Sequence, residues 1–161
     1  MNTVLDKYPS HRDLGGMEIG DELNPSRVPR PKVHVVKGDL VCRLDLPDQR
    51  WVIGIEVLLD TGCEITLISD SKVKELEDLR KLDLHAERKV MVRGKHRAAY
   101  DLAFVLPGGY PCTAPYGFVA VPKDEFGNVL DASEMLLGQD VMNQLVVTFD
   151  GPNGTVTICT P

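Results

Sequence analysis

The sequence lacks any apolar run long enough to cross a membrane as a helix. It also lacks the apolar core of a secretory signal, because the chain turns polar within residues 1–7. Basic residues are not in excess, and the net charge of -6 gives no reason to expect nucleic-acid binding. These absences predict an intracellular, cytoplasmic protein that binds no membrane and no nucleic acid.

Close pairs of metal ligands are absent as well. The four cysteines stand at positions 42, 63, 112 and 159 without a CxxC pair, and the four histidines at 11, 34, 85 and 96 do not supply the missing pairs. A structural zinc site needs ligands in close pairs. We therefore expect no metal and no cofactor, and we expect free, mostly buried thiols in a reducing compartment.

The composition, 43% hydrophobic and 26% charged, is ordinary for a soluble globular protein, and 161 residues suffice for one domain with a sizeable core. Residues 1–32 are polar, rich in glycine at Gly15 and Gly16, and interrupted by prolines, which is typical of a flexible tail or linker. A pro-segment or a targeting arm is the functional alternative to an unstructured leader. Residues 33–161 are expected to form the folded domain.

Short apolar segments separated by turn residues predict an all-β domain. A short helix is predicted after Ser69, because Val73, Leu76 and Leu79 recur at a spacing of three. The number and regular spacing of the strands favour a closed, barrel-like sandwich with one or two short helices. Two hairpins are expected: strands at 33–36 and 40–46 around a turn at 37–39, and strands at 88–92 and from 96 around a turn at 93–95. Further strands are expected at 51–59, 98–106, 116–121, 145–150 and 155–158. Residues 122–128 are expected to form an exposed insertion.

A run of apolar, strand-forming residues at positions 57–59 leads to a lone carboxylate, Asp60. Apolar neighbours partly desolvate such a group, and desolvation opposes the ionisation of a carboxylate. Gly62 permits a sharp turn and the close approach of another chain, while the hydroxyl of Thr61 both donates and accepts hydrogen bonds. The segment therefore has the composition of a tight turn that presents one acidic group.

The triplet Asp60-Thr61-Gly62, followed by residues 66–69, resembles the catalytic loop of retropepsin-type aspartic proteases. Residues 135–142 are similar to a second signature of that family, in which apolar residues precede a glycine and a short helix. The segments 145–150 and 155–158 resemble its closing strands. The likeness spans about residues 33 to 160 and implies the closed retropepsin fold.

The resemblance implies hydrolysis of peptide bonds by a water held between two carboxylates, one acting as base and the other as acid. The two groups share one proton, because neighbouring carboxylates do not both ionise cheaply. This chain offers Asp60 alone, so the second carboxylate must come from a twin chain in a C2 homodimer. Thr61 is then expected to bond across the interface and Gly62 to lie beside a polypeptide substrate. Leu137 and Gly138 are expected to pack beneath the loop and support it.

Two features depart from the retroviral pattern. Retroviral relatives usually pair an acid two residues after the glycine of the triplet with an arginine after the glycine of the second signature. Here Glu64 keeps the acid, but Gln139 replaces the arginine, so the charged pair becomes at most a hydrogen bond and the strength of the dimer is left open. The expected flap, a hairpin that closes over bound peptide, has the substrate-binding tip Arg93-Gly94-Lys95, where retroviral flaps are rich in glycine.

Three functions fit these residues. The first is an active, homodimeric aspartic endopeptidase. The second is a catalytically silent retropepsin-like module for dimerisation or peptide binding, and the third is a generic β-barrel with a chance Asp-Thr-Gly turn. The second signature argues against chance, and the enzyme is favoured because activity is most simply lost by losing Asp60, which is present.

Overall fold

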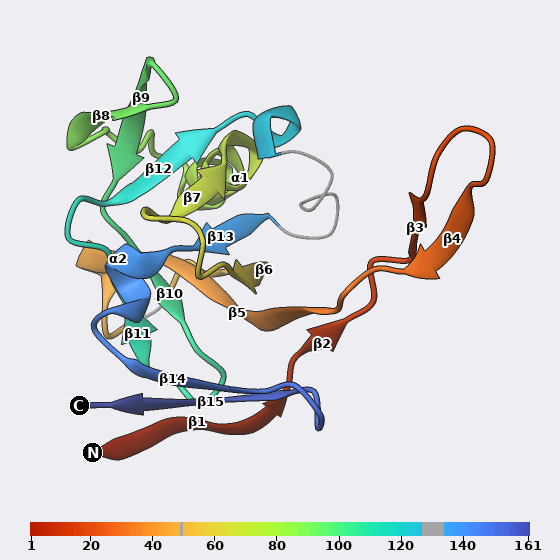
Figure 1. Ribbon diagram of the computed structural model, residues 1–161. Helices are drawn as coiled ribbons and strands as arrows, with labels where there is room; N and C mark the ends of the chain where they lie inside the picture. The colour runs from red at the N-terminus through yellow and green to blue at the C-terminus, as the bar shows by residue number, and fades with distance from the viewer. Residues whose placement is uncertain (49, 127–133) are drawn as a thin grey trace.

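The computed structural model describes residues 1–48, 50–126 and 134–161. Strands dominate this part of the chain and form a large ten-stranded sheet, a three-stranded sheet and a two-stranded hairpin (Figure 1). The predicted all-β character is therefore confirmed. No helix in the described ranges is both long and apolar enough to cross a bilayer. The helical elements are α1 (Asp70–Arg80), α2 (Gln139–Met142) and the 3-10 helices η1 (Arg43–Asp45) and η2 (Lys123–Phe126).

The large sheet provides the strands on both sides of Asp60. Its neighbouring strands follow the order β11-β10-β5-β6-β13-β7-β12-β9-β8, and β2 pairs with β5 off this path. At its centre β6 and β13 run parallel, flanked by β5 and β7. The strands are β2 (His11–Arg12), β5 (Val33–Cys42), β6 (Ile53–Leu59), β7 (Leu67–Ser69), β8 (Arg88–Val92), β9 (Lys95–Tyr100), β10 (Leu102–Val105), β11 (Pro111–Cys112), β12 (Phe118–Val121) and β13 (Met135–Leu137).

The predicted closed barrel is not found among the described residues. The large sheet ends at β8 on one side and at β11 on the other, and no pairing joins these two strands. Both strands have features that end a sheet. β11 is two residues long, and Pro111 has no N–H to donate to a further strand. β8 is the outer strand of a hairpin that projects from the body (Figure 1).

One predicted turn is wrong. Residues 37–39 do not separate two strands, because they lie within β5, which runs without interruption to Cys42, where η1 follows, and pairs with β6 along this stretch. A Cβ at Gly38 would lie 2.6 Å from Cε2 of Phe104 and would also meet the backbone carbonyl of Val105. The glycine therefore serves the close approach of a neighbouring strand rather than a turn.

The first residues are not the flexible tail that the sequence predicts. β1 (Asn2–Pro9) pairs antiparallel with β15 (Thr155–Thr160), which also pairs with β14 (Val146–Asp150), and these three strands form the second sheet. Leu5 is buried in the core, and Val4 and Tyr8 pack against it. The backbone partner of β1 lies at the other end of the sequence, so no local pattern reveals it.

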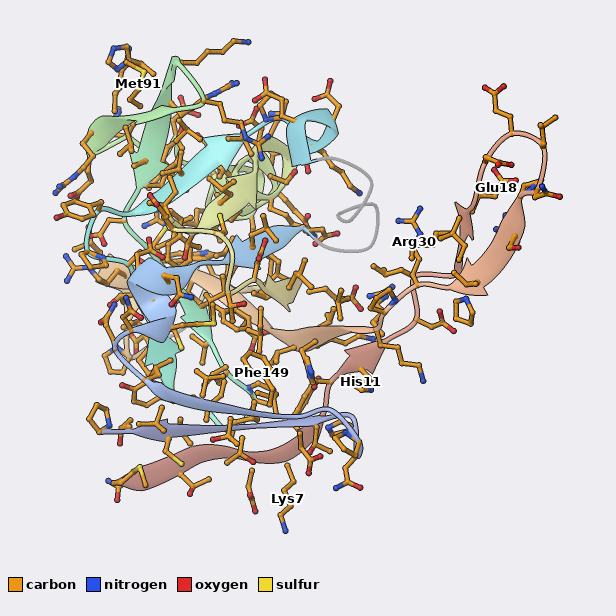
Figure 2. All side chains as sticks on the ribbon, viewed as in Figure 1. Lys7, His11, Glu18, Arg30, Met91 and Phe149 are labelled. Atoms are coloured by element: carbon orange, nitrogen blue, oxygen red, sulfur yellow. The ribbon has the colours of Figure 1, made fainter. Side chains whose placement is uncertain are left out.

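Residues 16–29 form the hairpin of β3 (Gly16–Ile19) and β4 (Ser26–Pro29), which we call the N-terminal arm. The arm projects away from the main body, with Glu18 on its outer part and Arg30 at its root (Figures 1 and 2). Ile19 and Leu23 are 47% and 89% exposed. The arm is the part of the predicted tail that stays outside the main body.

The helix predicted after Ser69 is confirmed as α1. The side chain of Ser69 caps it by accepting a hydrogen bond from the N–H of Ser71. Val73 and Leu76 are buried as expected, whereas Leu79, in the last turn, is 44% exposed. The predicted apolar stripe is therefore one position shorter than the sequence indicates. Of the predicted insertion at residues 122–128, positions 123–126 form η2, and 127–128 lie outside the described residues.

Candidate active site

The loop that carries Asp60 follows directly from the centre of the large sheet. Val57 and Leu59 at the end of β6 are buried in the main apolar core, and Leu58 is buried in a second apolar cluster. The parallel pairing with β13 continues one step beyond β6, where the N–H of Asp60 donates to the carbonyl of Leu137 at 3.1 Å. The end of the strand therefore fixes the backbone position of Asp60.

Backbone groups of the turn orient the carboxylate of Asp60. The N–H of Gly62 donates to Oδ1 at 2.9 Å, and the N–H of Cys63 donates to the Asp60 carbonyl at 3.2 Å. No described residue donates a hydrogen bond to Oδ2. Asp60 is half-buried, whereas Thr61 and Gly62 are exposed. The turn thus holds one carboxylate oxygen and leaves the other available to a further group.

Gly138 lies against the far end of the same loop. A Cβ at this position would lie 2.5 Å from the carbonyl carbon of Ile65 and 2.9 Å from the carbonyl oxygen of Cys63. Next to it, the N–H of Gln139 donates to the Cys63 carbonyl at 2.8 Å. Only glycine permits this approach of β13 and α2 to the loop. Leu137, which is buried, and Gly138 therefore lie directly against the loop.

Thr66 and Asp140 form a buried polar link that the sequence reasoning missed. The Thr66 hydroxyl donates to Oδ1 of Asp140 at 2.7 Å, and its N–H donates to Oδ2 at 3.1 Å. The N–H of Gly138 in turn donates to the Thr66 hydroxyl at 3.1 Å. Thr66 is fully buried. The signal in the sequence is one hydroxyl between the apolar residues 65 and 67, since a buried polar side chain needs a partner.

The expected hydrogen bond between Glu64 and Gln139 is not formed in the described structure. The Gln139 side-chain amide donates instead to the carbonyl of Thr61 at 2.6 Å, and Glu64 is exposed. The amide N–H groups of glutamine need an acceptor of either kind, and here the backbone carbonyl of Thr61 is the one in reach. Gln139 therefore ties α2 to the residue next to Asp60 rather than to the acid predicted for it.

Cys63 is the other reactive residue type beside Asp60. Burial raises the pKa of its thiol, and its Sγ donates to the carbonyl of Ile65 at 2.9 Å. All four cysteines are free, and burial raises the pKa of Cys42 to about 11 and of Cys112 to about 12. Because the thiolate is the nucleophilic form, a protonated Cys63 does not suit nucleophilic catalysis. In the described ranges, no three His, Cys, Asp or Glu side chains gather as a metal site.

The predicted flap is the hairpin of β8 and β9. Its two-residue turn is Arg93-Gly94, with φ of 51° and 77°, and Lys95 already belongs to β9. The primed turns of tight hairpins require positive φ, which glycine adopts readily. Val90 and Val92 of the hairpin pack against the second apolar cluster, which Cys63 and Ile65 of the Asp60 loop also contact. One apolar cluster therefore joins the hairpin and the loop.

Several surface cavities of the described chain are not lined by Asp60. A cavity of about 270 Å³ at the base of the β8–β9 hairpin is lined by Arg43, Arg88, Asp101 and Tyr116, among others. Three others, of about 250 to 340 Å³, are likewise not lined by Asp60.

No protein-family model matches the chain, and no curated protein matches it. The likeness to retropepsin-type proteases therefore stays an expectation from the two sequence motifs.

Proposed function

We propose that two copies of this chain form a homodimeric aspartic endopeptidase of the retropepsin type, in which Asp60 of each copy acts on a water that attacks a peptide bond. The observation that carries the proposal is the Asp60 turn. One carboxylate oxygen is held by the N–H of Gly62 at 2.9 Å, and no described residue donates to the other. A carboxylate held in this way has a free oxygen with which to accept a proton from water.

One carboxylate does not complete the reaction. Hydrolysis needs a base that takes a proton from water and an acid that gives a proton to the leaving amine. Asp60 of one subunit takes the first role, and protonated Asp60 of the other takes the second. Adjacent carboxylates hold one proton between them, because both do not ionise cheaply. The shared proton is lost as the pH rises, so we expect the highest rate in acid.

The surroundings of Asp60 support a site shared between two subunits. Asp60 is half-buried, and Thr61 and Gly62 beside it are exposed in the single chain, so the loop is accessible to a second copy. A twofold axis beside the loop brings a second copy of the same surface opposite it. In this arrangement Thr61 bonds across the axis and Gly62 lies beside the substrate.

Contacts between the two sequence motifs support the retropepsin fold as part of the same proposal. The Asp60 loop and the segment from Leu137 through Gly138 to α2 are joined by backbone hydrogen bonds and by the link from Thr66 to Asp140. A chance Asp-Thr-Gly turn does not require a glycine at position 138, where a Cβ would meet Ile65. The β8–β9 hairpin, with Arg93, Gly94 and Lys95 at its tip, takes the part of the flap over bound peptide.

The test is cleavage of a diverse peptide mixture by the purified protein at several pH values. Asp60→Asn is expected to lower the cleavage rate by about 10³-fold or more, because the amide cannot act as a base. The fold is expected to persist, since the side chains are nearly isosteric. Asp78→Asn, a change on the exposed face of α1, is the matched control and should keep full activity.

Dilution tests whether the site is shared. If each chain carries half a site, specific activity falls as the dimer dissociates on dilution. Full activity of a monomer at every dilution would contradict the shared site, and full activity of Asp60→Asn would contradict the assignment of the catalytic residue. A stable dimer that cleaves no peptide at any pH would favour the alternative, a catalytically silent module for dimerisation or peptide binding.

A further inference from the structure

Basic side chains of the β8–β9 hairpin converge on one acidic residue, Glu125 in η2. The guanidinium of Arg97 forms an ion pair with its Oε2, and Nζ of Lys95 lies 3.9 Å from its Oε1. Nη1 of Arg93 donates a hydrogen bond of 2.7 Å to its backbone carbonyl. We call these four residues the Glu125 cluster. It contains every residue of the predicted flap tip except Gly94.

The Glu125 cluster supports the half of the hairpin that lies beyond its pairing with β12. β9 pairs with β12 at Ala99 and Tyr100, near the base of the hairpin. From Ala98 toward the tip, the pairings of β9 in the described structure are those with β8. Glu125 follows shortly after β12. Strand β12 supports the base of the hairpin, and Glu125 supports the part nearer the tip.

The contact between Arg97 and Glu125 is the most enclosed part of the cluster. The two side chains are 17% and 30% exposed, whereas Lys95 is 69% exposed. A pair withdrawn from solvent is screened less by salt than an exposed pair. Nε of Arg97 is buried and has no hydrogen-bond partner among the described residues, so Glu125 supplies the guanidinium's principal polar contact. Arg97 first, and then Lys95 and Arg93, hold the pKa of the Glu125 carboxyl below its ordinary value.

The β8–β9 hairpin and the Asp60 loop are linked through one apolar cluster. Val90 and Val92 pack against the apolar cluster that Cys63 and Ile65 also contact. Burial raises the pKa of the Cys63 thiol, and the positive charge of Arg93 is near enough to oppose that rise. A change in the hairpin's position therefore changes the space beside the loop.

We propose that Glu125 is a positioning residue, which fixes the outer half of the β8–β9 hairpin relative to the Asp60 loop and offsets the charge that the hairpin presents to a bound peptide. The catalytic meaning of this role rests on the proposed protease function, but the fixing itself is a property of the single chain. Without the carboxylate charge, the hairpin keeps its β12 pairing at the base and the Arg93 bond to the Glu125 carbonyl, and it loses the ion pairs of Arg97 and Lys95. Local opening then rises while global stability stays the same.

Glu125→Gln tests the fixing directly. Trypsin cleavage after Arg93 and Lys95, and hydrogen exchange of the amides of residues 93–97, are expected to be at least about 5-fold faster than in the unsubstituted protein. Arg97→Gln removes the other half of the ion pair and should have the same effect on exchange. Asp124→Asn changes the exposed neighbouring acid, which makes no ion pair with the hairpin in the described structure. It is the matched control and should behave like the unsubstituted protein.

Equal exchange and equal trypsin cleavage in Glu125→Gln and the unsubstituted protein would overturn the proposal. So would faster exchange throughout the chain with a lowered unfolding midpoint, which indicates a general loss of stability. Neither measurement requires cleavage activity, so both remain decisive if the protease proposal fails. If peptides are cleaved, Glu125→Gln should raise KM more than it lowers kcat. The variant should also gain a salt-sensitive preference for an acidic over a matched neutral peptide. If it does not, Glu125 does not offset the charge that the hairpin presents to a bound peptide.

Discussion

The β8–β9 hairpin and the N-terminal arm have the same local architecture and very different surroundings. Each consists of two antiparallel strands joined by a turn. The β8–β9 hairpin is paired with β12, packed against an apolar cluster and held by Glu125. The arm is a two-stranded sheet by itself, and Ile19 and Leu23 project from it into solvent. An isolated hairpin is marginally stable in water, so the contacts outside the hairpin decide its order.

The comparison predicts that stability is concentrated around the Asp60 loop and low in the arm. Regions with many buried contacts open only with the whole domain, whereas regions with few open locally. Substitutions of residues that pack against the Asp60 loop should therefore lower the free energy of unfolding of the whole protein. Changes in the arm should leave it almost untouched.

The largest effect is expected from Gly138→Ala. The added Cβ would lie 2.5 Å from the carbonyl carbon of Ile65, and backbone at that place cannot move aside cheaply. We expect a loss of about 3 kcal/mol in the free energy of unfolding, measured by denaturant titration. Gly54→Ala is the matched control, because nothing lies within 4 Å of a Cβ at that position. Equal effects of the two substitutions would contradict the close approach.

A smaller loss is expected from Thr66→Val, which keeps the shape of the side chain and removes its hydroxyl. Asp140 then loses a donor, and the N–H of Gly138 loses its acceptor. A buried group left without a partner costs about 2 kcal/mol. Thr148→Val, at an exposed position of β14, controls for the exchange of the residue type. An unchanged unfolding free energy for Thr66→Val would show that the link carries no stability.

Acid is expected to weaken the junction between the arm and the body. Burial, and then the neighbouring His11, lower the pKa of His34, whose Nδ1 lies 2.6 Å from the Ser10 hydroxyl and whose ring lies 4.8 Å from that of Phe149. The folded state therefore binds fewer protons than the unfolded state between the lowered pKa and the ordinary value of 6.5. The contribution of neutral His34 to the free energy of unfolding is present above pH 6.5 and is lost as the pH falls through this window.

Thermal unfolding at pH 7 and pH 5 measures this contribution. The midpoint should fall on acidification, and the fall should be smaller in His34→Gln, which does not titrate. Asp150, whose pKa is held low chiefly by hydrogen bonds from Asn153, keeps its charge in this range and does not mask the effect. The same fall in both proteins would assign the pH dependence to other groups.

The smallest effect is expected from removing the arm. Residues 17–28 can be replaced by two glycines, because Gly16 and Pro29 are already paired opposite each other. Surface changes of this kind usually alter the free energy of unfolding by less than about 0.5 kcal/mol. A loss as large as that of Thr66→Val would show that the arm supports the fold and would abolish the contrast between the two hairpins.

The sequence predicts well where the determining contacts are local. The helix after Ser69, the hairpin around Gly94 and the strand that leads into Asp60 all follow from nearby residues. Gly62 is correctly expected in a turn, as its N–H donates to Asp60. Periodicity and turn chemistry act over a few residues, so they reveal such elements directly.

The sequence fails where the partner is distant. Gly38 is interpreted as a turn, although it accommodates Phe104 and Val105 from another strand. The link between Thr66 and Asp140, and the choice of Thr61 rather than Glu64 as the partner of Gln139, depend on how β13 and α2 lie against the loop. The closed sheet was expected from the number of strands, but closure depends on which edges meet, and the edges at β8 and β11 do not.

The pairing of β1 with β15 has a consequence for how the chain reaches its structure. Asn2 lies opposite Thr160, so this ladder joins positions separated by almost the whole sequence. Loop closure over such a span is entropically costly, and contacts of this kind slow folding. During synthesis the residues of β1 emerge before those of β15, and until β15 has left the ribosome they lack this pairing partner. For that interval Val4, Leu5 and Tyr8 lack the core that later covers them, and this stretch is where a folding chaperone would find the nascent protein most in need of protection.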